Sequence, residues 1–456
     1  MKTIIIGTGA AGFGSYLAIK KQKKLNEVIF YNYGKEIQSQ KISYKTFPSI
    51  TFPQKKEFGE IYSRLKINNS KFKINYGKTR GGLSDFWSGS VFPFSRKELK
   101  ERKLLFLKKY YQIISENIAI IGNEYKPNKI YYKYKLTDNL KQIPSLNCFD
   151  QIELSAPNFE IHVNSNRVLS SSACIYCGNC FKGCEKNVIF RPIKNFHGAH
   201  IKTLEISKIK KVKNEWFLFD VNGNLVDKCQ RLFLALGTFQ TIKLLNQSGL
   251  INYKNIEIYD SNAITFPIKI KSVKKNYEDN YGYANKIISI FGKKSAKFDV
   301  QISIVPFNHF FAYSIFGTFV GKFIQDYLIN NFALGMFFSS AIESNTYKIT
   351  SSSEIYIKND KKISAFKTLK TIVSIINKTS HKFRIINFFK HSESSIHYSS
   401  NLLSANIPFF ERSEFIKNLY IIDGNLFPGK PTSNGNTFSI IAGAYAITNK
   451  YITLKM

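Results

Sequence analysis

The sequence predicts a protein of the α/β class, with a parallel-sheet unit assembled from separated segments and an inserted, mainly antiparallel domain. Three observations lead to this prediction. A buried strand, a glycine turn and a helix follow one another at residues 2–22, and the same order returns at residues 230–249. Residues 251–395 instead alternate apolar and polar positions and contain few glycines, which is typical of antiparallel strands. The 456 residues are enough to bury a large core.

The first strand–turn–helix segment carries the pattern G-x-G-x-x-G at Gly7, Gly9 and Gly12. Directly after a strand, such glycines permit a tight turn, close approach of the backbone to a pyrophosphate, and close packing of the helix on the strand. The helix N-terminus adds partial positive charge near the phosphates. We therefore predict a Rossmann-like dinucleotide site at the start of the chain.

The second strand, "EVIFYN", ends on Asn32. An Asp or Glu ordinarily stands at this place and binds a ribose hydroxyl. Asn is able to accept one such hydrogen bond, so we expect Asn32 to contact the dinucleotide. The missing carboxylate does not decide between FAD and a nicotinamide dinucleotide.

The remaining elements follow in order along the chain. A glycine-rich loop at residues 76–93 precedes a charged helix at 95–117, and the second strand–turn–helix unit has Gly237 at its turn. A strand, a loop and a helix of small residues end the chain. The most apolar stretch, residues 308–342, is interrupted by charged and amide side chains, so no run reaches the ~20 apolar residues that span a bilayer. We expect a buried helix pair there.

The formal net charge of +35 suggests an anionic partner, such as nucleic acid, an acidic membrane surface or a charged substrate. Lys outnumbers Arg, and no helix-turn-helix, zinc-finger or RNP-type signature is present. We therefore expect no nucleic-acid partner, while peripheral contact with an anionic membrane stays open. No apolar targeting segment precedes the first strand, so we expect a cytoplasmic protein.

Four segments together resemble those of the glucose–methanol–choline (GMC) oxidoreductases, flavoproteins that oxidise alcohols and sugars. They are the first glycine motif, "GGLSDFWSGSVFP" from Gly81, "RLFLALGTFQTIKLLNQSG" from Arg231, and "NLYIIDGNLFPGKPTSNGNTFSIIAGAYAI" from Asn418. Their order and separations are similar to those of the family, whereas residues 251–390 do not align with it.

The resemblance implies FAD as the cofactor. It also implies an FAD-binding domain of residues 1–130, 190–250 and 395–456, a cysteine-rich segment of residues 131–189, and a substrate-binding domain of residues 251–394. The residues implied to bind the cofactor are Gly7, Gly9, Gly12, Asn32, Gly81, Gly82, Ser84, Gly237, Asp423, Gly424, Asn436, Thr437 and Phe438.

The resemblance further implies two catalytic residues. His397 stands where the family has its first active-site histidine, although the positions after it depart from the family's glycine-containing pattern, and His391 is the alternative. The second residue corresponds to Asn436, with Asn434 one register away. His397 would take the proton of the substrate hydroxyl while the adjacent carbon delivers hydride to flavin N5. Asn436 would donate a hydrogen bond to the developing oxyanion.

Four of the six cysteines lie at C-x2-C-x2-C-x3-C spacing. They are Cys174, Cys177, Cys180 and Cys184. This spacing is that of a bacterial ferredoxin loop and favours a 4Fe–4S cluster. In such loops the fourth cysteine usually serves another cluster, so Cys148 or Cys229 is the candidate remote ligand. Zinc, and the free thiols of a cysteine-rich subgroup of the GMC family, remain open alternatives.

These features predict an FAD-dependent oxidoreductase that acts on the CH–OH group of a small alcohol or sugar. The sequence does not define the electron acceptor, so a dehydrogenase and an oxygen-using oxidase both stay open. The alternative to an enzyme is an inactive flavin-fold scaffold at an anionic membrane surface. It stays open because the ribose-binding position and the histidine segment depart from the usual pattern.

Overall fold

The computed structural model shows a mixed α/β fold with several sheets. The described residues are 2–34, 62–65, 74–77, 79–85, 93–94, 96–118, 120–122, 159–164, 166–168, 192–270, 286–292, 299–306, 324, 327–328, 331–339, 341–349, 355–379, 383–391, 397–431 and 437–454.

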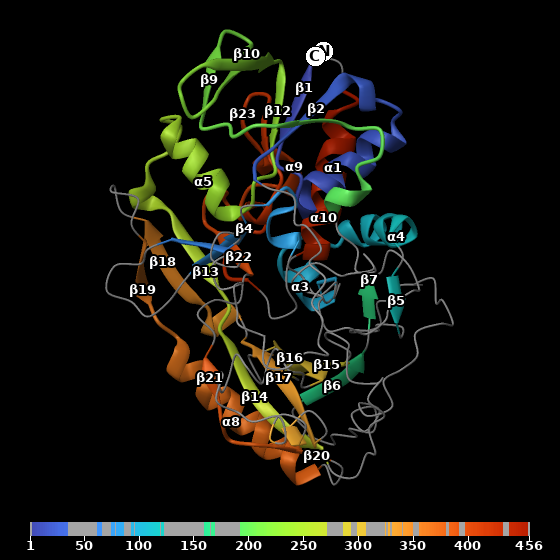
Figure 1. Cartoon of the computed structure of the whole chain (residues 1–456), viewed down its shortest axis with the longest axis vertical. Helices are drawn as coiled ribbons and strands as arrows, with labels where there is room; N and C mark the ends of the chain where they lie inside the picture. The colour runs from blue at the N-terminus through green and yellow to red at the C-terminus, as the bar shows by residue number, and fades with distance from the viewer. Residues whose placement is uncertain are drawn as a thin grey trace.

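Six strands within the described residues form a sheet in the order β23-β24-β12-β1-β2-β8. Their bounds are β1 Thr3–Ile6, β2 Val28–Asn32, β8 His200–Thr203, β12 Arg231–Leu234, β23 Glu414–Ile416 and β24 Leu419–Ile421. All neighbours run parallel except β23 and β24. Every residue of β1 and β12 is buried, as expected where a parallel sheet is covered on both faces. Regions far apart in sequence therefore meet in one sheet (Figure 1).

Helices α1 (Ala10–Lys21) and α10 (Thr437–Tyr451) pack side by side against this sheet (Figure 1). Their backbones approach at Gly14, where a Cβ atom would lie 2.2 Å from the carbonyl oxygen of Ile441. A buried hydrogen bond of 2.7 Å joins the hydroxyls of Ser15 and Thr448 across the same pair. The two ends of the described chain are thereby held together by a packed helix pair.

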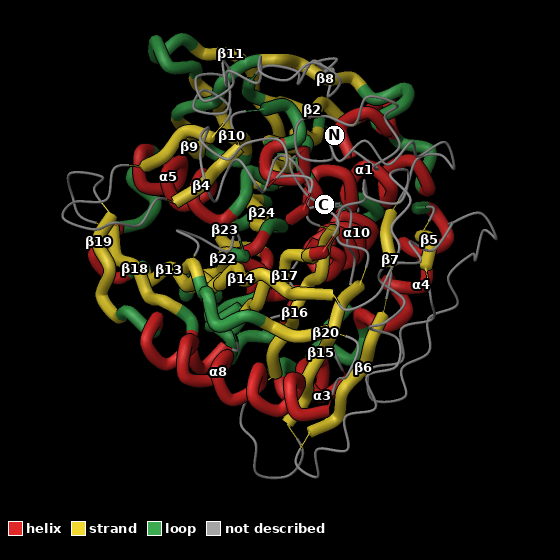
Figure 2. Tube along the Cα trace, turned by 60° about the horizontal axis from the view of Figure 1, so that its bottom comes forward, coloured by secondary structure: helices red, strands yellow, loops and turns green. Residues whose placement is uncertain are grey.

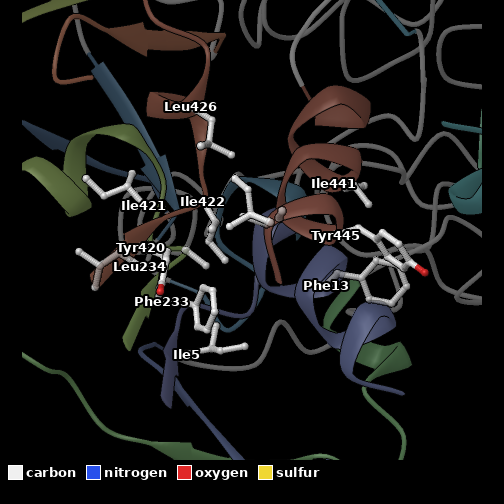
Figure 3. Packing of buried hydrophobic residues seen from close by; sticks show 14 of the residues in the cluster. Ile5, Phe13, Phe233, Leu234, Tyr420, Ile421, Ile422, Leu426, Ile441 and Tyr445 are labelled. Carbon is white, nitrogen blue, oxygen red and sulfur yellow. The ribbon is translucent and has the colours of Figure 1, made fainter. Parts of the chain in front are cut away.

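Apolar side chains from the sheet and from both helices fill the core of this unit, as Figure 3 shows. Ile5, Phe233 and Ile421 stand on three adjacent strands and have no exposed surface. Phe13 extends from α1 and Tyr445 from α10, and each side chain is 2% exposed. The core is thus built by the N-terminal, central and C-terminal regions together.

The predicted helix at 95–117 is divided into α3 (Arg96–Glu101) and α4 (Leu107–Asn117). Lys103 adopts a φ of 56°, and Leu104 donates its backbone N–H to Leu99 at 2.6 Å while Lys103 donates to Lys100 at 3.1 Å. This pair of bonds is a Schellman motif, which ends a helix. Leu99 and Leu104 are both buried, so their contact with the core favours the interruption.

A three-stranded meander and helix α5 (Thr238–Gln247) accompany the parallel sheet. The meander consists of β9 (Lys208–Val212), β10 (Glu215–Phe219) and β11 (Leu225–Cys229). An ion pair fixes it to the sheet, because Lys2 contacts the Asp227 carboxylate, which also accepts a hydrogen bond of 2.9 Å from the Tyr31 hydroxyl.

An antiparallel sheet forms the lower part of the view in Figure 1, in the order β20-β14-β17-β16-β15-β6 with β21 beside β14. The bounds are β6 Phe159–Asn164, β14 Ala263–Ile270, β15 Lys286–Gly292, β16 Asp299–Pro306, β17 Phe332–Phe338, β20 Phe383–Ile385 and β21 Lys390–His391. Helix α8 (Lys362–Thr379) lies along one face (Figure 2). Among the described residues, no helix is long and apolar enough to cross a membrane.

The predicted buried helix pair at 308–342 is wrong for its described C-terminal part. Residues Phe332–Phe338 form β17, which pairs with β14 on one side and β16 on the other. Ala333 and Phe337 join the α8-facing core, whereas Leu334 packs with the core of the parallel-sheet unit. Because both faces are buried, the strand reads as a continuous apolar run, which periodicity cannot separate from a buried helix.

A third sheet has the order β19-β18-β13-β22. Its bounds are β13 Glu257–Asp260, β18 Asn345–Ile349, β19 Ile355–Asn359 and β22 Tyr398–Ser400. The ladder of β13 with β22 joins the expected substrate-binding segment to the C-terminal segment. Strand β6, from the expected cysteine-rich segment, likewise pairs with β15. Backbone ladders therefore tie together parts of the chain that the sequence suggests are separate.

The other described elements are short. They are β3 Tyr62–Leu65, β4 Ile74–Gly77, β5 Ile120–Gly122, β7 Asn166–Val168, α9 Phe409–Ser413, and the 3-10 turns η1 Leu25–Glu27, η2 Gly82–Asp85, η5 Pro192–Asn195, η6 Tyr253–Asn255, η8 Ala341–Glu343 and η9 Gly424–Leu426.

Candidate functional site

Two glycines where β1 leads into α1 leave no room for a side chain. Gly7 has a φ of 114°, and a Cβ atom there would lie 2.2 Å from the carbonyl oxygen of Ala235. Its backbone N–H donates to Tyr31 on β2 at 2.8 Å. A Cβ atom on Gly12 would lie 2.1 Å from the carbonyl oxygen of Gly7. These contacts set the N-terminus of α1 tightly against the end of the parallel sheet.

The double-glycine turn lies against this helix N-terminus. A Cβ atom on Gly9 would be 3.1 Å from the carbonyl oxygen of Gly81, and the Thr8 hydroxyl donates to the carbonyl of Arg80. Within the turn, Gly82 has a φ of 58° and the Ser84 hydroxyl donates to the carbonyl of Gly81 at 2.6 Å. The structure therefore brings Gly9, Gly81, Gly82 and Ser84 together.

Asn32 ends β2 and is only 3% exposed. Its backbone carbonyl accepts a hydrogen bond of 2.9 Å from Leu204, but neither its Oδ1 nor its Nδ2 has a partner among the described residues. An unsatisfied buried amide costs about 1–3 kcal/mol. A ribose hydroxyl would supply the missing partner, so this residue fits a bound dinucleotide.

A buried polar cluster joins the C-terminal strand to α5. The Asp423 carboxylate accepts from the Thr241 hydroxyl, from the Asn425 backbone at 3.1 Å and from the Asn425 side chain at 2.8 Å. The Ser400 hydroxyl donates in turn to Asn425 Oδ1. Burial raises the pKa of the Asp423 carboxyl above its usual value. The hydrogen bonds that the carboxylate accepts from Thr241, Asn425 and Gly237 limit the rise.

Gly424 lies where three segments meet. A Cβ atom there would be 2.5 Å from the Thr238 hydroxyl and 2.9 Å from the carbonyl oxygen of Tyr398. That carbonyl accepts the Thr238 hydroxyl at 3.2 Å. Gly237, which precedes α5, has a φ of 86°. The close approach therefore places β22 against both the start of α5 and the segment after β24.

His397 directly precedes β22. Its ring centroid lies 5.1 Å from that of Phe338 at the end of β17, and its Nδ1 atom is buried. Burial lowers the pKa of His397 to about 4, so the imidazole is neutral near pH 7. The alternative, His391, lies on β21, where its backbone pairs with Ile264 of β14.

The start of α10 carries two further predicted contacts. Thr437 is the first residue of the helix, and the Phe438 ring stacks on Tyr111 at a centroid distance of 5.1 Å. Phe438 is therefore held within the interface of α10 with α4. Asn436 and Asn434 lie outside the described residues.

Sequence reasoning missed Thr241, Asn425 and Ser400. Thr241 stands one helical turn after Thr238, and Asn425 follows the Asp-Gly pair of the C-terminal segment. Two threonines three residues apart place both hydroxyls on one face of α5, a pattern that indicates a polar contact on that face. No local pattern indicates Ser400, because its role depends on the position of Asn425 across the fold.

The four closely spaced cysteines, together with Cys148, lie outside the described residues. Cys229 is a free cysteine at the end of β11 with no exposed surface, and burial raises the pKa of its thiol to about 12. Its place in the hydrophobic core makes it a poor remote ligand. Among the described residues, no group of three or more His, Cys, Asp or Glu side chains could hold a metal ion.

Comparison with known proteins finds similarity in the fold and not in the sequence. No family model and no curated protein matches the chain. In contrast, 518 chains of solved structures match it. One is pyridoxine 4-oxidase from Mesorbium loti, with a TM-score of 0.65, 11% sequence identity and coverage of 100% of both chains.

The chain shares that fold. The likeness extends over the parallel sheet, the antiparallel sheet and the segments that join them, since both chains are covered in full. At 11% identity the likeness shows the fold alone.

Proposed function

We propose that this protein is an FAD-dependent oxidoreductase that acts on the CH–OH group of a small alcohol. The observation that carries the proposal is the contact between Gly424 and the carbonyl of Tyr398. It sets the strand that follows His397 against the segment at the end of the parallel sheet. The full-length fold likeness to pyridoxine 4-oxidase and the motif resemblance to GMC oxidoreductases support the same reading.

The residues at the end of the parallel sheet fit the cofactor. The N-terminus of α1 and the backbone of Gly9 and Gly81 would receive the pyrophosphate. The Asn32 amide, which has no partner in the part of the chain that the structure describes, would bind the ribose. When bound, FAD supplies an acceptor for the hydride that leaves the alcohol carbon. The carboxylate of Asp423 also joins α5 to the C-terminal segment, and its contact with the cofactor stays a prediction.

His397 would act as the base. A neutral imidazole is able to accept the hydroxyl proton, and the lowered pKa keeps the ring unprotonated at neutral pH. The ring of Phe338 packs against it and limits its rotation. Asn436 is the proposed hydrogen-bond donor to the oxygen that gains charge as the carbonyl forms. The imidazole would take the hydroxyl proton, and bound FAD would supply the acceptor for the hydride, so that the oxidation balances.

The acceptor that reoxidises the cofactor distinguishes a dehydrogenase from an oxidase. Pyridoxine 4-oxidase is an oxidase by its name, so oxygen is the first acceptor to test. The iron–sulfur hypothesis would add one-electron transfer from the cofactor to a partner, which favours a dehydrogenase. Oxygen consumption compared with reduction of an artificial acceptor would separate the two.

The test is anaerobic bleaching of the flavin absorbance by a panel of alcohols that includes pyridoxine. We expect wild-type protein to be yellow and to bleach with at least one alcohol, and the variant His397→Gln to bind flavin without bleaching. The matched control is His200→Gln, an exposed histidine on β8, which should bleach normally. His391→Gln tests the alternative base.

Two results would overturn the proposal. Folded but colourless protein that takes up no added FAD would remove the cofactor. Yellow protein that no alcohol bleaches would instead favour the inactive scaffold.

A further inference from the structure

The antiparallel sheet has one face toward α8 and one toward the parallel-sheet unit. On β16, Val300, Ile302 and Ile304 belong to the apolar cluster that includes the α8 side chains. Gln301 and Ser303 alternate with them and therefore point from the opposite face. Both are buried, with 5% of their surface exposed. A polar pair thus occupies the face where an apolar pair would ordinarily pack.

Strand register connects Gln301 with the candidate base. Gln301 stands directly opposite Phe338 of β17 in the antiparallel ladder, and Phe338 stands opposite Ala263 of β14. Directly opposed residues share a face, with Cβ atoms about 5 Å apart. The Phe338 ring packs on His397. Gln301 therefore lies on the same face of the sheet as this contact, on the neighbouring strand β16.

The same face meets the parallel-sheet unit. Leu334 and Met336 alternate with the α8-facing residues of β17 and share the face of Phe338, and both pack with the hydrophobic core of that unit. The face is therefore turned toward the parallel-sheet unit, which carries the proposed cofactor-binding residues.

The Gln301 carboxamide is half-satisfied among the described residues. Its Nε2 donates to the Ser303 hydroxyl at 3.3 Å, whereas its buried Oε1 has no partner there. This intra-strand bond orients the amide and leaves its oxygen as an acceptor. A buried unsatisfied acceptor costs about 1–3 kcal/mol, which a ligand donor would recover.

We infer that Gln301 is a specificity-determining residue that accepts a hydrogen bond from a second polar group of the substrate. The inference rests on the proposed function and names its substrate class: alcohols with a further hydroxyl or another hydrogen-bond donor, in preference to simple alkanols or aryl alcohols. Gln301 touches no reacting atom in this scheme. It acts by holding the far end of the molecule while His397 holds the reacting hydroxyl.

The test compares alcohols that differ in one polar group. Glycerol is paired with 1-propanol, and pyridoxine with benzyl alcohol, in anaerobic flavin bleaching of wild type and of Gln301→Met, which has nearly the same volume without polar atoms. For the variant we expect the half-saturating concentration of the polar member to rise about tenfold, with that of the apolar member and both limiting rates unchanged. Ile302→Val, on the opposite face, is the matched control and should alter neither preference.

A second variant distinguishes the loss of the hydrogen-bond acceptor from misfolding caused by a substitution at this position. Gln301→Glu retains an acceptor oxygen and should keep the preference for polar alcohols, whereas Gln301→Met loses it. Equal changes for both members of a pair, or no change in a yellow, folded variant, would overturn the inference and leave the proposed function intact. If wild-type protein bleaches with no alcohol at all, the proposed function fails and this inference fails with it.

Discussion

The carboxylate of Asp423 accepts a hydrogen bond from the hydroxyl of Thr241, although 182 positions separate the two residues in the sequence. Asp423 follows β24 and Thr241 lies on α5, so the bond fixes the C-terminal segment to the helix after β12. Both residues are almost fully buried. The strand that follows His397 packs against the same junction through Gly424. The proposed base, His397, therefore directly precedes a strand that this polar cluster holds in place.

Replacing Thr241 with Val should destabilise the protein by about 1–3 kcal/mol, because the isosteric side chain leaves one oxygen of a buried carboxyl without its donor. Urea unfolding of the purified protein measures this loss. The control is Thr241→Ser, which keeps the hydroxyl and should lose much less. Equal losses for Val and Ser would show that the methyl group, and not the hydrogen bond, is what matters at this position.

Gly14→Ala should destabilise the pair of α1 and α10 even though Ala is the better helix former by about 1 kcal/mol. The added Cβ atom would lie 2.2 Å from the carbonyl oxygen of Ile441 and 3.2 Å from the Ala444 side chain, so the helices have to separate. Overpacking of this kind typically costs about 1–3 kcal/mol. The melting temperature reports the change.

Gly223→Ala provides the comparison for that experiment. Gly223 has a φ of 82° and open space around it, so Ala there costs only backbone strain of about 1–2 kcal/mol and leaves the core intact. A Gly14→Ala variant as stable as wild type would contradict the close helix contact.

Asn32→Leu should affect the free protein and the FAD complex in opposite directions. Without ligand, removing a buried amide that has no partner among the described residues leaves stability unchanged or raises it by up to about 1 kcal/mol. FAD should bind about tenfold more weakly, because the ribose loses its partner. Melting curves with and without FAD measure both effects. If the free variant is strongly destabilised while FAD affinity is unchanged, the amide serves the fold and not the cofactor.

The lowered pKa of His397 predicts a dependence of stability on pH. Well above pH 6.5 neither the folded nor the unfolded state protonates this group, so it contributes no slope. Between pH 6.5 and about 4 the unfolded state binds the proton first, so the free energy of unfolding falls as the pH is lowered. His397→Gln should remove that part of the acid-induced loss. A variant with the same slope as wild type between pH 7 and pH 5 would contradict the lowered pKa.

The iron–sulfur hypothesis predicts iron and acid-labile sulfide in protein purified without oxygen, with a brown absorbance that disappears on acidification. Cys177→Ser should remove the iron, whereas Cys229→Ala should only loosen the core, since Cys229 is enclosed by apolar side chains. Zinc in place of iron would support the zinc site. Four titratable thiols with no metal would support free cysteines.

Much of the fold follows from local patterns. β1, the glycine turn and α1 are predicted where the structure has them. Burial of β1 on both faces requires a run of mostly apolar residues, and the lack of room at Gly7 and Gly12 requires glycine. The sequence predicts helix for the stretch that contains β17, because a continuous apolar run has no periodicity that separates a buried strand from a buried helix. The break between α3 and α4 was also missed, because Lys103 in a left-handed conformation has no distinctive sequence signature.

The sequence alone determined the nature of the components: a dinucleotide motif, a double-glycine turn, and a histidine and an amide near the C-terminus. A left-handed backbone, such as that of Gly7 and Gly82, is a local requirement, so residue type reports it. Tertiary structure alone decided which components meet, including Gly9 with Gly81, Asp423 with Thr241, and His397 with Phe338. Each of these contacts joins segments distant in sequence, and its energy depends on the packing of the whole core, which no short stretch of residues encodes.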